Sequence, residues 1–295
     1  MRAVISRTPG ALSLAEVPVP RSDAGQVLVQ VHASALNPVD AQTLDGMYHD
    51  LGMVTQSDGV GLGWDAAGVV LEVGAEVTGI APGHRVALLS HGVDKPLGAL
   101  AEQVVVPSEA VAPLPGQLPF DLAATVPLNG LTAWQAVDLL GEPDGRLLVT
   151  GAAGAVGALG CLFARERGWE VVGLARLSDE TFVRSLGVEF TAGLEGLTVD
   201  AVLDAAVIPE QSLDVVRDGG RYVGLIPPAV PESRRGISPT AVFVQPDAAL
   251  LQTLVNRAGQ GELPLRIAAR LPLDDIEEAL ALSRTSGLRG RVVLV

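Results

Sequence analysis

Apolar residues in the middle of the chain fall into short continuous runs that alternate with a helical pattern. One apolar run covers residues 147–149 and ends at a glycine-rich stretch. Apolar positions then recur at helical spacing over 156–163, and a second continuous run follows at 171–175. Continuous runs of this length are typical of strands buried on both faces of a parallel sheet. The pattern therefore predicts a strand–helix–strand unit over residues 147–175.

The alternation of strand and helix patterns continues downstream. An apolar run that ends near Asp204 is followed by a helical pattern with a glycine stop, and further runs follow it. Regular alternation of this kind is typical of a doubly wound α/β sheet. The expected elements are strands at 199–206, 221–226 and 240–245, and helices at 209–220 and 246–261.

The start and the end of the chain have a different pattern. Short β-type runs, separated by Gly, Pro and Asp, occupy the first part and predict a separate, mainly β domain. The last segment ends in an isolated apolar strand that we expect to return to that domain. The predicted organisation is a β-rich domain at 1–118, an α/β domain at 119–264, and a returning segment at 265–295.

Composition narrows the classes of partner. The 295 residues include 34 acidic and 20 basic ones, so the formal net charge is −14. Such a charge repels nucleic acid and anionic membranes wherever no local basic patch intervenes. A hydrophobic content of 48% supplies ample core for a globular fold. We therefore expect small-molecule chemistry, with no nucleic acid and no membrane as partner.

A cytoplasmic location is expected. Cys161 is the only cysteine, which excludes an intrachain disulfide and a multi-cysteine metal site and fits a reducing compartment. Arg7 interrupts the N-terminal apolar run, so no export signal is expected. Residues 147–164 are uncharged but barely reach the roughly 18 residues of a membrane span, and their glycines lack the four-residue spacing of a dimerisation stripe.

The loop at residues 152–157 is the main candidate ligand site. A turn between a buried strand and a helix presents unpaired N–H groups and a positive dipole end to an anion. Gly154 lacks the Cβ that would keep a pyrophosphate away, and Gly157 lets the helix pack closely on the strand. A dinucleotide phosphate would suit this loop, although glycines also serve ordinary structural turns.

The end of the next strand favours NADP(H) over NAD(H). NAD-binding units commonly have Asp or Glu at this strand end, about 20 residues after the glycine-rich loop, where the carboxylate accepts hydrogen bonds from the ribose 2′-hydroxyl. This chain has Arg176 at that place, with Ser178 close behind. A guanidinium would pair with a 2′-phosphate, which a carboxylate would repel. The alternative is that Arg176 is a solvated loop residue and Ser178 caps the next helix.

Six segments in order resemble the medium-chain dehydrogenase/reductase superfamily, and within it the zinc-independent quinone oxidoreductase family. Each segment alone is a weak signal, but together they cover nearly the whole chain. They are ALNPVDAQTLDGMY, GWDAAGVVLEVGAEVTGIAPGHRV, VPLNGLTAWQAV, VTGAAGAVG, FVRSLGVE and RGRVVLV.

The resemblance implies an α/β protein with a Rossmann-type doubly wound parallel sheet and a mainly β, GroES-like catalytic domain. It implies NADP(H) as the cofactor and hydride transfer to a quinone or an α,β-unsaturated carbonyl; a homodimer is also expected. Zinc-dependent relatives have Gly-His-Glu where this chain has Gly63-Trp64-Asp65, and ligand cysteines near Asn37 and Leu128. None of these ligands is present, so no metal site is expected.

Asn37 and Tyr48 are the expected catalytic residues. By the resemblance, a substrate cleft lies between the domains, and either side chain could donate a hydrogen bond to the acceptor oxygen, where negative charge develops. Simpler roles stay open, since Asn-Pro favours a turn, Asp40 could cap a helix and Trp64 could be core. The implied cleft residues are Asn37, Asp40, Tyr48, Trp64, Asn129 and Phe243.

The expected cofactor contacts divide by the part of the nucleotide. The phosphate loop meets the pyrophosphate, Arg176 and Ser178 meet the 2′-phosphate, and the remaining residues lie near the nicotinamide, except that Arg291 reaches the pyrophosphate. The full set is Thr132, Ala152, Ala153, Gly154, Ala155, Val156, Gly157, Arg176, Ser178, Phe243, Val244 and Arg291.

Two other functions stay open at this point. The chain could be an NADP(H)-binding sensor or structural protein without useful turnover, because a fold does not guarantee activity. It could also be an enoyl reductase that serves a biosynthetic assembly and acts on a carrier-bound enoyl group. The proline-rich segment at 227–240 could be a flap, a dimer contact or a solvated loop.

Overall fold

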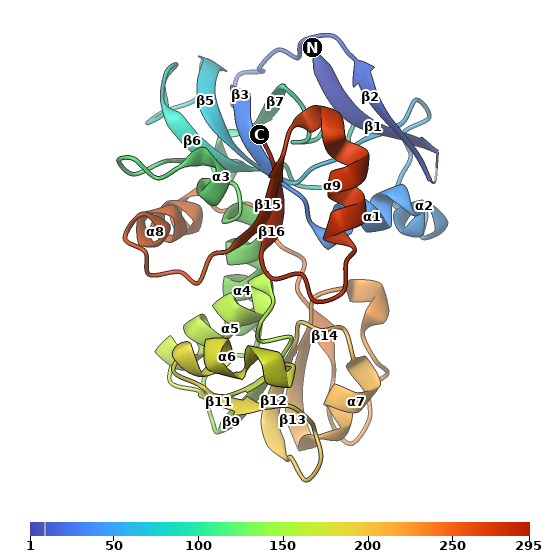
Figure 1. The fold of residues 1–295 in the computed structure, drawn as a ribbon, viewed down its shortest axis with the longest axis vertical. Helices are drawn as coiled ribbons and strands as arrows, with labels where there is room; N and C mark the ends of the chain where they lie inside the picture. Colours follow the sequence, from blue (N-terminus) through green and yellow to red (C-terminus); the bar gives the residue numbers. More distant parts are fainter. Residues whose placement is uncertain (9) are drawn as a thin grey trace. The chain divides into compact units, whose positions relative to one another are not determined.

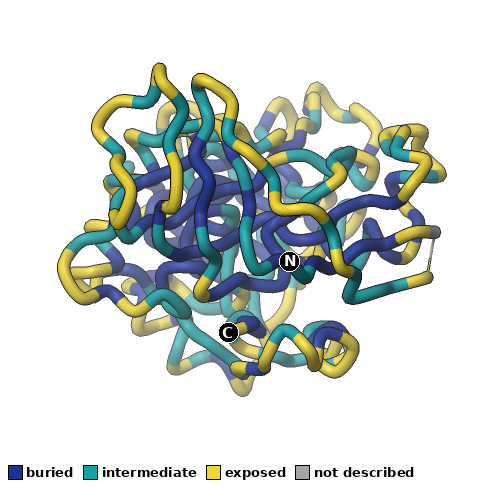
Figure 2. Tube along the Cα trace, turned by 90° about the horizontal axis from the view of Figure 1, so that it is seen from above, coloured by how far each residue is buried: buried dark blue, intermediate teal, exposed yellow. Residues whose placement is uncertain are grey.

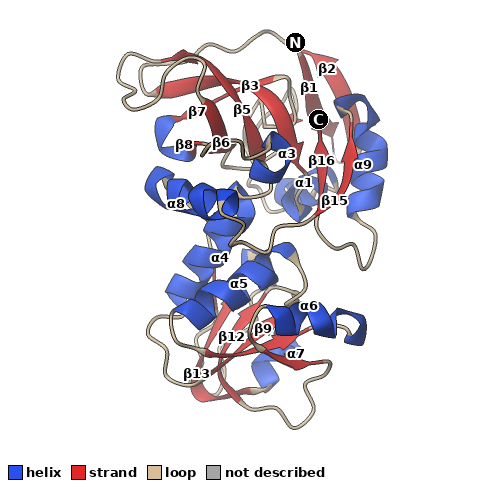
Figure 3. Ribbon diagram, turned by 60° about the vertical axis from the view of Figure 1, so that its left-hand side comes forward, coloured by secondary structure: helices blue, strands red, loops and turns tan. Residues whose placement is uncertain are grey.

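The computed structural model describes residues 1–8 and 10–295 and divides into two compact units (Figure 1). Unit 1 combines Met1–Leu128 with Gln245–Val295, and unit 2 is Asn129–Val244. Strands dominate unit 1, whereas strands and helices alternate in unit 2 (Figure 3). Buried residues lie mainly in the strands, and exposed residues lie mainly in the connecting loops. Figure 2 shows the buried residues in dark blue and the exposed ones in yellow.

Unit 1 is built mainly on antiparallel pairing, with β15 and β16 as a parallel pair. One sheet has the order β15-β16-β3-β5-β6-β8 with β7 also paired to β3, and a smaller sheet has the order β2-β1-β4. In β7, Val104 and Val106 are buried while Val105 between them is half-buried, the period-two pattern of a strand with one face on the core. The strands are β1 (Arg2–Thr8), β2 (Ala11–Glu16), β3 (Gln26–Ala35), β4 (Val60–Gly61), β5 (Asp65–Val73), β6 (Arg85–Leu89), β7 (Gln103–Pro107), β8 (Val111–Pro113), β15 (Ile267–Leu271) and β16 (Arg291–Leu294).

Short helices join these strands. Pro38 at the start of α1 suits a first helical turn, where its missing N–H costs nothing. α4 begins in unit 1 and continues in unit 2. The helices are α1 (Pro38–Leu44), α2 (Met47–Asp50), η1 (Ser108–Ala110), α3 (Phe120–Ala123), α4 (Pro127–Leu139), α8 (Ala248–Gly259), η4 (Leu273–Asp275) and α9 (Ile276–Ser283).

The C-terminal part of the chain lies in unit 1. β16 pairs antiparallel with β3, so the last strand is part of the sheet formed by the N-terminal residues. α8 also belongs there, and Gln252 on this helix donates through Nε2 to the carbonyl oxygen of Pro113 at 2.9 Å. The units therefore divide after Leu128 and after Val244, whereas the sequence places the divisions after residues 118 and 264.

Unit 2 is a doubly wound parallel sheet with the order β11-β10-β9-β12-β13-β14. The order reverses at β9, which pairs with β10 on one side and β12 on the other, and ligands bind such sheets at this reversal. The strands are β9 (Arg146–Thr150), β10 (Glu170–Leu174), β11 (Glu189–Thr191), β12 (Val199–Asp204), β13 (Val216–Gly224) and β14 (Thr240–Ala241). The helices are α5 (Ala155–Glu166), η2 (Leu177–Asp179), α6 (Glu180–Ser185), α7 (Pro209–Asp214) and η3 (Pro227–Ala229).

Two elements of unit 2 differ from the sequence prediction. The helix expected at 209–220 ends at Asp214, because Val216 instead pairs with Val199 and starts β13, where its side chain is buried. The strand expected at 240–245 is only Thr240–Ala241, the two residues that pair with β13. No helix in the described part of the chain is long and apolar enough to cross a membrane.

Candidate functional site

A glycine turn joins β9 to α5. Gly151 has φ +61°, a left-handed conformation that favours glycine. A Cβ on Gly157 would lie 2.1 Å from the carbonyl oxygen of Gly151, so only glycine lets the helix approach the turn this closely. Gly154 caps the helix and is exposed, which leaves the positive end of α5 open to an anion. These residues fit the pyrophosphate of a dinucleotide.

Arg176 and Ser178 follow the carboxyl end of β10, the strand next to β9. Both residues are exposed, and Arg176 directly precedes the short helix η2. Asp179 after them is buried at the start of α6, so it is Asp179 that occupies the cap position expected for Ser178. The arginine thus lies at the strand end where a ribose 2′-substituent is read in this kind of fold.

A hydrogen-bond network at the carboxyl end of β12 was not anticipated from the sequence. The Thr150 hydroxyl donates to Asp204 Oδ1 at 2.6 Å, and the Tyr222 hydroxyl donates to Oδ2 at 2.8 Å. The backbone N–H of Ile208 also donates to Asp204, and that of Ala206 to the Thr150 hydroxyl oxygen. The network fixes the loop beside the glycine turn at residues 151–157, which we call the phosphate turn. The only signal of this network in the sequence is Asp204, an aspartate that ends a buried strand.

The remaining predicted cofactor residues lie in both units. Thr132 is buried on α4, and Phe243 and Val244 follow β14, with Phe243 64% exposed. Arg291 belongs to β16 of unit 1, where burial lowers its pKa although the carboxylates of Asp65 and Asp40 oppose the shift. Of the loop residues, Ala152 is buried and Ala153, Ala155 and Val156 are half-buried.

In unit 1, Asn37 lies at the start of α1 with its side chain buried. Its Nδ2 donates to Asp65 Oδ2 at 2.8 Å and to the Ala35 carbonyl oxygen at 3.2 Å. Its backbone N–H donates to Asp40 Oδ2 at 2.9 Å. Two acceptors around one amide nitrogen fix the amide orientation, so Oδ1 is the remaining acceptor. No donor among the described residues reaches this buried oxygen.

Asp65 and Asp40 are buried carboxylates at this site. Asp65 Oδ1 accepts from the backbone N–H of Leu128 at 2.6 Å, and Asp40 Oδ1 accepts from that of Gly63 at 2.8 Å. Burial raises the pKa of Asp65 to about 7, although the hydrogen bonds from Leu128 and Asn37 oppose the shift. Burial likewise raises the pKa of Asp40.

Tyr48 lies on α2 and is 8% exposed. Its hydroxyl donates to Gln42 Oε1 at 3.1 Å. Burial, and next the Asp40 carboxylate, raise the pKa of its phenol above the ordinary value. The neutral hydroxyl is therefore the stable form near pH 7, and it can donate a hydrogen bond but not act as a base.

Trp64 is buried, and its ring meets His91 edge-on at 5.4 Å between centroids. Unit 1 thus brings together five of the residues expected around the substrate or cofactor: Asn37, Asp40, Tyr48, Trp64 and Arg291. Asn129 and Phe243 lie in unit 2. Sequence reasoning missed Asp65 as a partner of Asn37, and it missed Lys95, which contacts Gly63 and Trp64.

The residues of unit 1 do not fit a zinc ion. Trp64 offers an indole N–H, which is a donor only, and both oxygens of Asp65 already accept N–H donors. Within residues 1–8 and 10–295, no three His, Cys, Asp or Glu side chains are grouped so that they could hold a metal ion. Cys161 is buried, which raises the pKa of its thiol to about 12 and leaves it unreactive.

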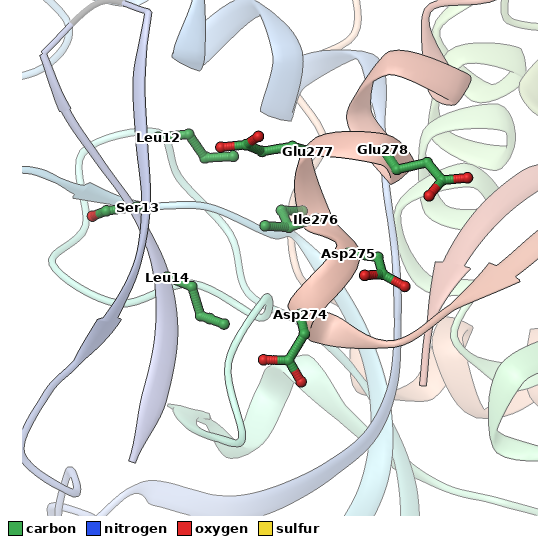
Figure 4. Close-up of a pocket in the computed structure, with 8 residues that line it drawn as sticks. All are labelled: Leu12, Ser13, Leu14, Asp274, Asp275, Ile276, Glu277 and Glu278. Carbon is green, nitrogen blue, oxygen red and sulfur yellow. The ribbon is translucent and has the colours of Figure 1, made fainter.

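A groove elsewhere in unit 1 contains none of the predicted site residues. It has a volume of about 350 Å³ and lies between β2 and the η4–α9 segment (Figure 4). Four carboxylates project from the helical side, while Leu12, Ser13 and Leu14 line the strand side. Asp274 is paired there with Arg2 at 2.7 Å. The groove is acidic and contains no group suited to hydride transfer.

Family models match both parts of the chain. A model described as alcohol dehydrogenase GroES-like domain matches residues 23–116, and one described as zinc-binding dehydrogenase matches residues 177–294. The first match lies in the mainly β part of unit 1, as the expected GroES-like domain requires. The second begins after β10 and covers the rest of the doubly wound sheet and the C-terminal part of the chain as far as the terminal strand.

Curated relatives include reductases and parts of much larger proteins. The chain is 30% identical over 300 residues to a 2-methylene-furan-3-one reductase from Solanum lycopersicum, covering 94% of this chain and 74% of that protein. It is 39% identical over 215 residues to a spectinabilin polyketide synthase system protein from Streptomyces orinoci. That match covers 68% of this chain but only 9% of the length of the synthase protein.

Solved structures resemble the whole chain. The quinone oxidoreductase from Coxiella burnetii superimposes with a TM-score of 0.88 at 26% identity, covering 100% of this chain and 98% of that one. The CurK enoyl reductase gives a TM-score of 0.82 at 26% identity, covering 99% and 98%. Members of the family that these matches share bind NAD(P)(H). The chain therefore belongs to the medium-chain dehydrogenase/reductase superfamily and is an oxidoreductase.

Proposed function

We propose that this oxidoreductase transfers hydride from NADPH to an α,β-unsaturated carbonyl compound or a quinone, without a metal. The observation that carries the proposal is the polar side chains of unit 1: the neutral Tyr48 hydroxyl is a hydrogen-bond donor, and the residues around Asn37 and Asp65 do not fit zinc. Hydrogen bonds can stabilise negative charge on the oxygen of an acceptor that conjugation already activates. An unconjugated ketone would need stronger polarisation.

The phosphate turn supports the nucleotide part of the proposal. Gly154 leaves the N-terminus of α5 open for the pyrophosphate, and Arg176 lies at the end of β10, where it would pair with a 2′-phosphate. NADPH, when bound, supplies the hydride. The Thr150–Asp204 hydrogen bond holds the neighbouring loop in place for binding.

In this proposal Tyr48 is the hydrogen-bond donor and Asn37 is a hydrogen-bond acceptor. Tyr48 is neutral and donates to Gln42, and this hydrogen bond can be exchanged for one to the substrate oxygen. Asn37 has both amide hydrogens engaged, so Oδ1 can accept a hydrogen bond only from an N–H or O–H group of the nucleotide, because the carbonyl oxygen of an enone or quinone cannot donate one. The burial of both side chains excludes competing water and strengthens each contact.

Relatives support the choice of acceptor. The Solanum lycopersicum protein is named for reduction of a 2-methylene-furan-3-one, and the Coxiella burnetii protein for oxidoreduction of quinones. We also propose that the protein is a cytoplasmic homodimer. Light scattering after gel filtration should give twice the mass of the chain.

A second candidate is reduction of an enoyl thioester on a carrier protein. It is favoured by the 39% identity to a polyketide synthase component and by the likeness to an enoyl reductase structure. Comparing an enoyl group on an acyl carrier with the same group on a small thiol separates the two candidates. A higher kcat/KM for the carrier-bound form would favour the second.

NADPH oxidation should be measured with 1,4-benzoquinone, a short enone and a plain ketone. The proposal expects turnover with the first two and none with the ketone. Turnover with the ketone alone would contradict it. Tight NADPH binding without turnover on any acceptor, including the carrier thioester, would instead indicate a sensor or structural protein.

A further inference from the structure

Lys95 lies in the loop after β6, and its ammonium group has three acceptors around it. Nζ donates to the carbonyl oxygen of Gly63 at 2.8 Å, to Ser90 Oγ at 3.1 Å and to the Ser90 carbonyl oxygen. The same nitrogen lies 5.0 Å from the centre of the Trp64 ring. An ammonium has three N–H groups, so the protonated side chain satisfies every acceptor in this arrangement.

Lysine occurs once in the chain, at position 95, and every other one of the 20 Lys and Arg residues is an arginine. A guanidinium is planar and presents its donors as a fork, whereas an ammonium is compact and directs three donors to convergent acceptors. The three acceptors around Nζ converge on one point and therefore suit an ammonium rather than a guanidinium. The contacts of Lys95 thus explain why this one position departs from the chain's preference for arginine.

The Gly63 peptide is held from both sides. Its N–H donates to the Asp40 carboxylate, and its carbonyl oxygen accepts from Lys95. Gly63 has φ +101°, and a Cβ there would lie 2.2 Å from the backbone nitrogen of Leu100. The carbonyl oxygen of Gly63 also accepts from the backbone N–H of Ala99 at 3.0 Å, so Lys95 is one of its two donors. The backbone therefore has little freedom at this point.

The fixed segment leads directly to the side chain expected to contact the substrate. Asp65 comes two residues after Gly63 and accepts from Asn37 Nδ2 at 2.8 Å. Asp40, which holds the other side of Gly63, also accepts from the Asn37 backbone N–H. Lys95 is thus linked to Asn37 in two ways that both pass through Gly63: along the backbone to Asp65, which contacts the Asn37 amide, and through Asp40, which accepts from the Asn37 backbone N–H.

The charged groups of this cluster depend on one another. The carboxylates of Asp40 on α1 and Asp65 on β5 act on Lys95, and Arg291 on β16 acts on both carboxylates. Burial lowers the pKa of Lys95 to about 7, while the two carboxylates oppose the shift. Burial, and next the Asp40 carboxylate, raise the pKa of Tyr48 on α2, and the ring of His91 contacts the Trp64 ring edge-on.

We propose that Lys95 is a positioning residue of the reductase site, and that its ammonium form holds the segment 63–65 and thereby keeps the amide of Asn37 in the orientation that leaves Oδ1 as the acceptor of the site. The inference rests on the proposed function. A neutral amine has two N–H groups for three acceptors and loses its attraction to the Trp64 ring. Loss of the proton therefore weakens the contact of Lys95 with the Gly63 carbonyl oxygen and leaves that oxygen to the backbone N–H of Ala99.

The single lysine permits a direct test without turnover. Protein labelled with ¹⁵N at the lysine side chain gives one Nζ resonance, and ¹⁵N labelling of asparagine side chains reports on Asn37, assigned with Asn37→Ser. We expect Nζ to titrate between about pH 6 and 8, with the Asn37 amide shifting at the same midpoint. Asp65 also titrates near pH 7 and contacts the Asn37 amide directly, so the comparison is made in Asp65→Asn protein. There Lys95→Gln should remove the Asn37 shift, whereas Arg284→Gln, which removes an exposed charge paired with Asp45, should keep it.

Kinetics give the second readout. In the unmutated protein, kcat for a short enone should fall as pH rises through the Nζ midpoint, with NADPH affinity unchanged. Lys95→Gln should lower kcat about tenfold at pH 6 and flatten the profile. Lys95→Arg keeps the charge but not the three-donor geometry, so kcat should stay low while the profile is flat.

The outcomes separate this inference from the proposed function. Titration of Nζ near its ordinary value, above about pH 10, or an Asn37 amide that ignores Lys95→Gln in a folded protein, would overturn it. Coupled Nζ and Asn37 shifts in a protein that turns over no acceptor would reject the proposed reductase and leave the positioning of Asn37 by Lys95 in place. Lys95→Met serves as a second variant if Lys95→Gln does not fold.

Discussion

The amide of Asn37 donates to Oδ2 of Asp65 at 2.8 Å, and this one hydrogen bond sets what Asn37 can offer a ligand. With the second amide hydrogen on the Ala35 carbonyl oxygen, no N–H of the side chain is left for a substrate oxygen. Oδ1 remains as an acceptor. In the proposed reaction, donation to the substrate oxygen therefore falls to Tyr48 rather than to Asn37.

Tyr48→Phe tests this division of roles. If the hydroxyl stabilises charge that develops on the acceptor oxygen, kcat should fall about a hundredfold while NADPH affinity stays the same. Gln42→Ala is the matched control, because it removes the partner of the hydroxyl and keeps the hydroxyl itself. Turnover of Tyr48→Phe close to that of the unmutated protein would mean that Tyr48 only shapes the pocket.

Arg176 should determine the choice of nucleotide. We expect NADPH to bind at least about tenfold more tightly than NADH, through a charge-assisted contact with the 2′-phosphate. Arg176→Glu should erase the preference, since it removes that contact and adds repulsion. Isothermal titration with both nucleotides measures it, and Arg184→Gln, which lies on α6 and pairs with Glu180, is the control. Equal affinities in the unmutated protein would refute the assignment.

Metal removal should have no effect. The positions of zinc ligands in related dehydrogenases are occupied by Trp64, Asn37 and Leu128, and Asp65 is engaged by two N–H donors. Elemental analysis of purified protein should find no stoichiometric zinc. Incubation with a chelator should leave both the melting temperature and the turnover unchanged. One zinc per chain, lost together with activity, would contradict a metal-free mechanism.

Asp65 should make folding stability depend on pH. Its folded pKa, raised from 3.8 to about 7, means that the folded state binds more protons than the unfolded state between these values. This contribution to stability is complete at low pH and is lost as pH rises through about 7. Relative to Asp65→Asn, the free energy of unfolding should fall by about 1 kcal/mol per pH unit between about pH 4 and 7.

Urea unfolding at closely spaced pH values measures this difference. Asp65→Asn keeps the shape of the side chain and removes the titration, although its amide has one acceptor for the two donors on Asn37 and Leu128. The variant should therefore be less stable than the unmutated protein at low pH, and the difference should shrink as pH rises toward about 7. A difference between the two proteins that does not change with pH would show that Asp65 titrates at its ordinary value.

Local pattern was sufficient for the strand–turn–helix that begins at β9. The continuous apolar run, the glycines at 151, 154 and 157, and the helical spacing after them lie within 20 residues of one another, so the sequence alone predicts the strand, the turn and the helix. The same holds for Arg176 at the end of β10. Hydrophobic periodicity is a local property, which is why these elements can be read before the fold is known.

Only the tertiary structure decided the polar site of unit 1. Asn37 and Asp65 are 28 residues apart, and Lys95 meets Gly63 from a different loop; nothing local marks these as partners. The sequence likewise gave no reason for Val216 to leave its helix and pair with Val199. Such contacts depend on which strands and loops pack together, and burial then sets the pKa of Asp65 and Lys95, because desolvation exists only once the chain has folded around them.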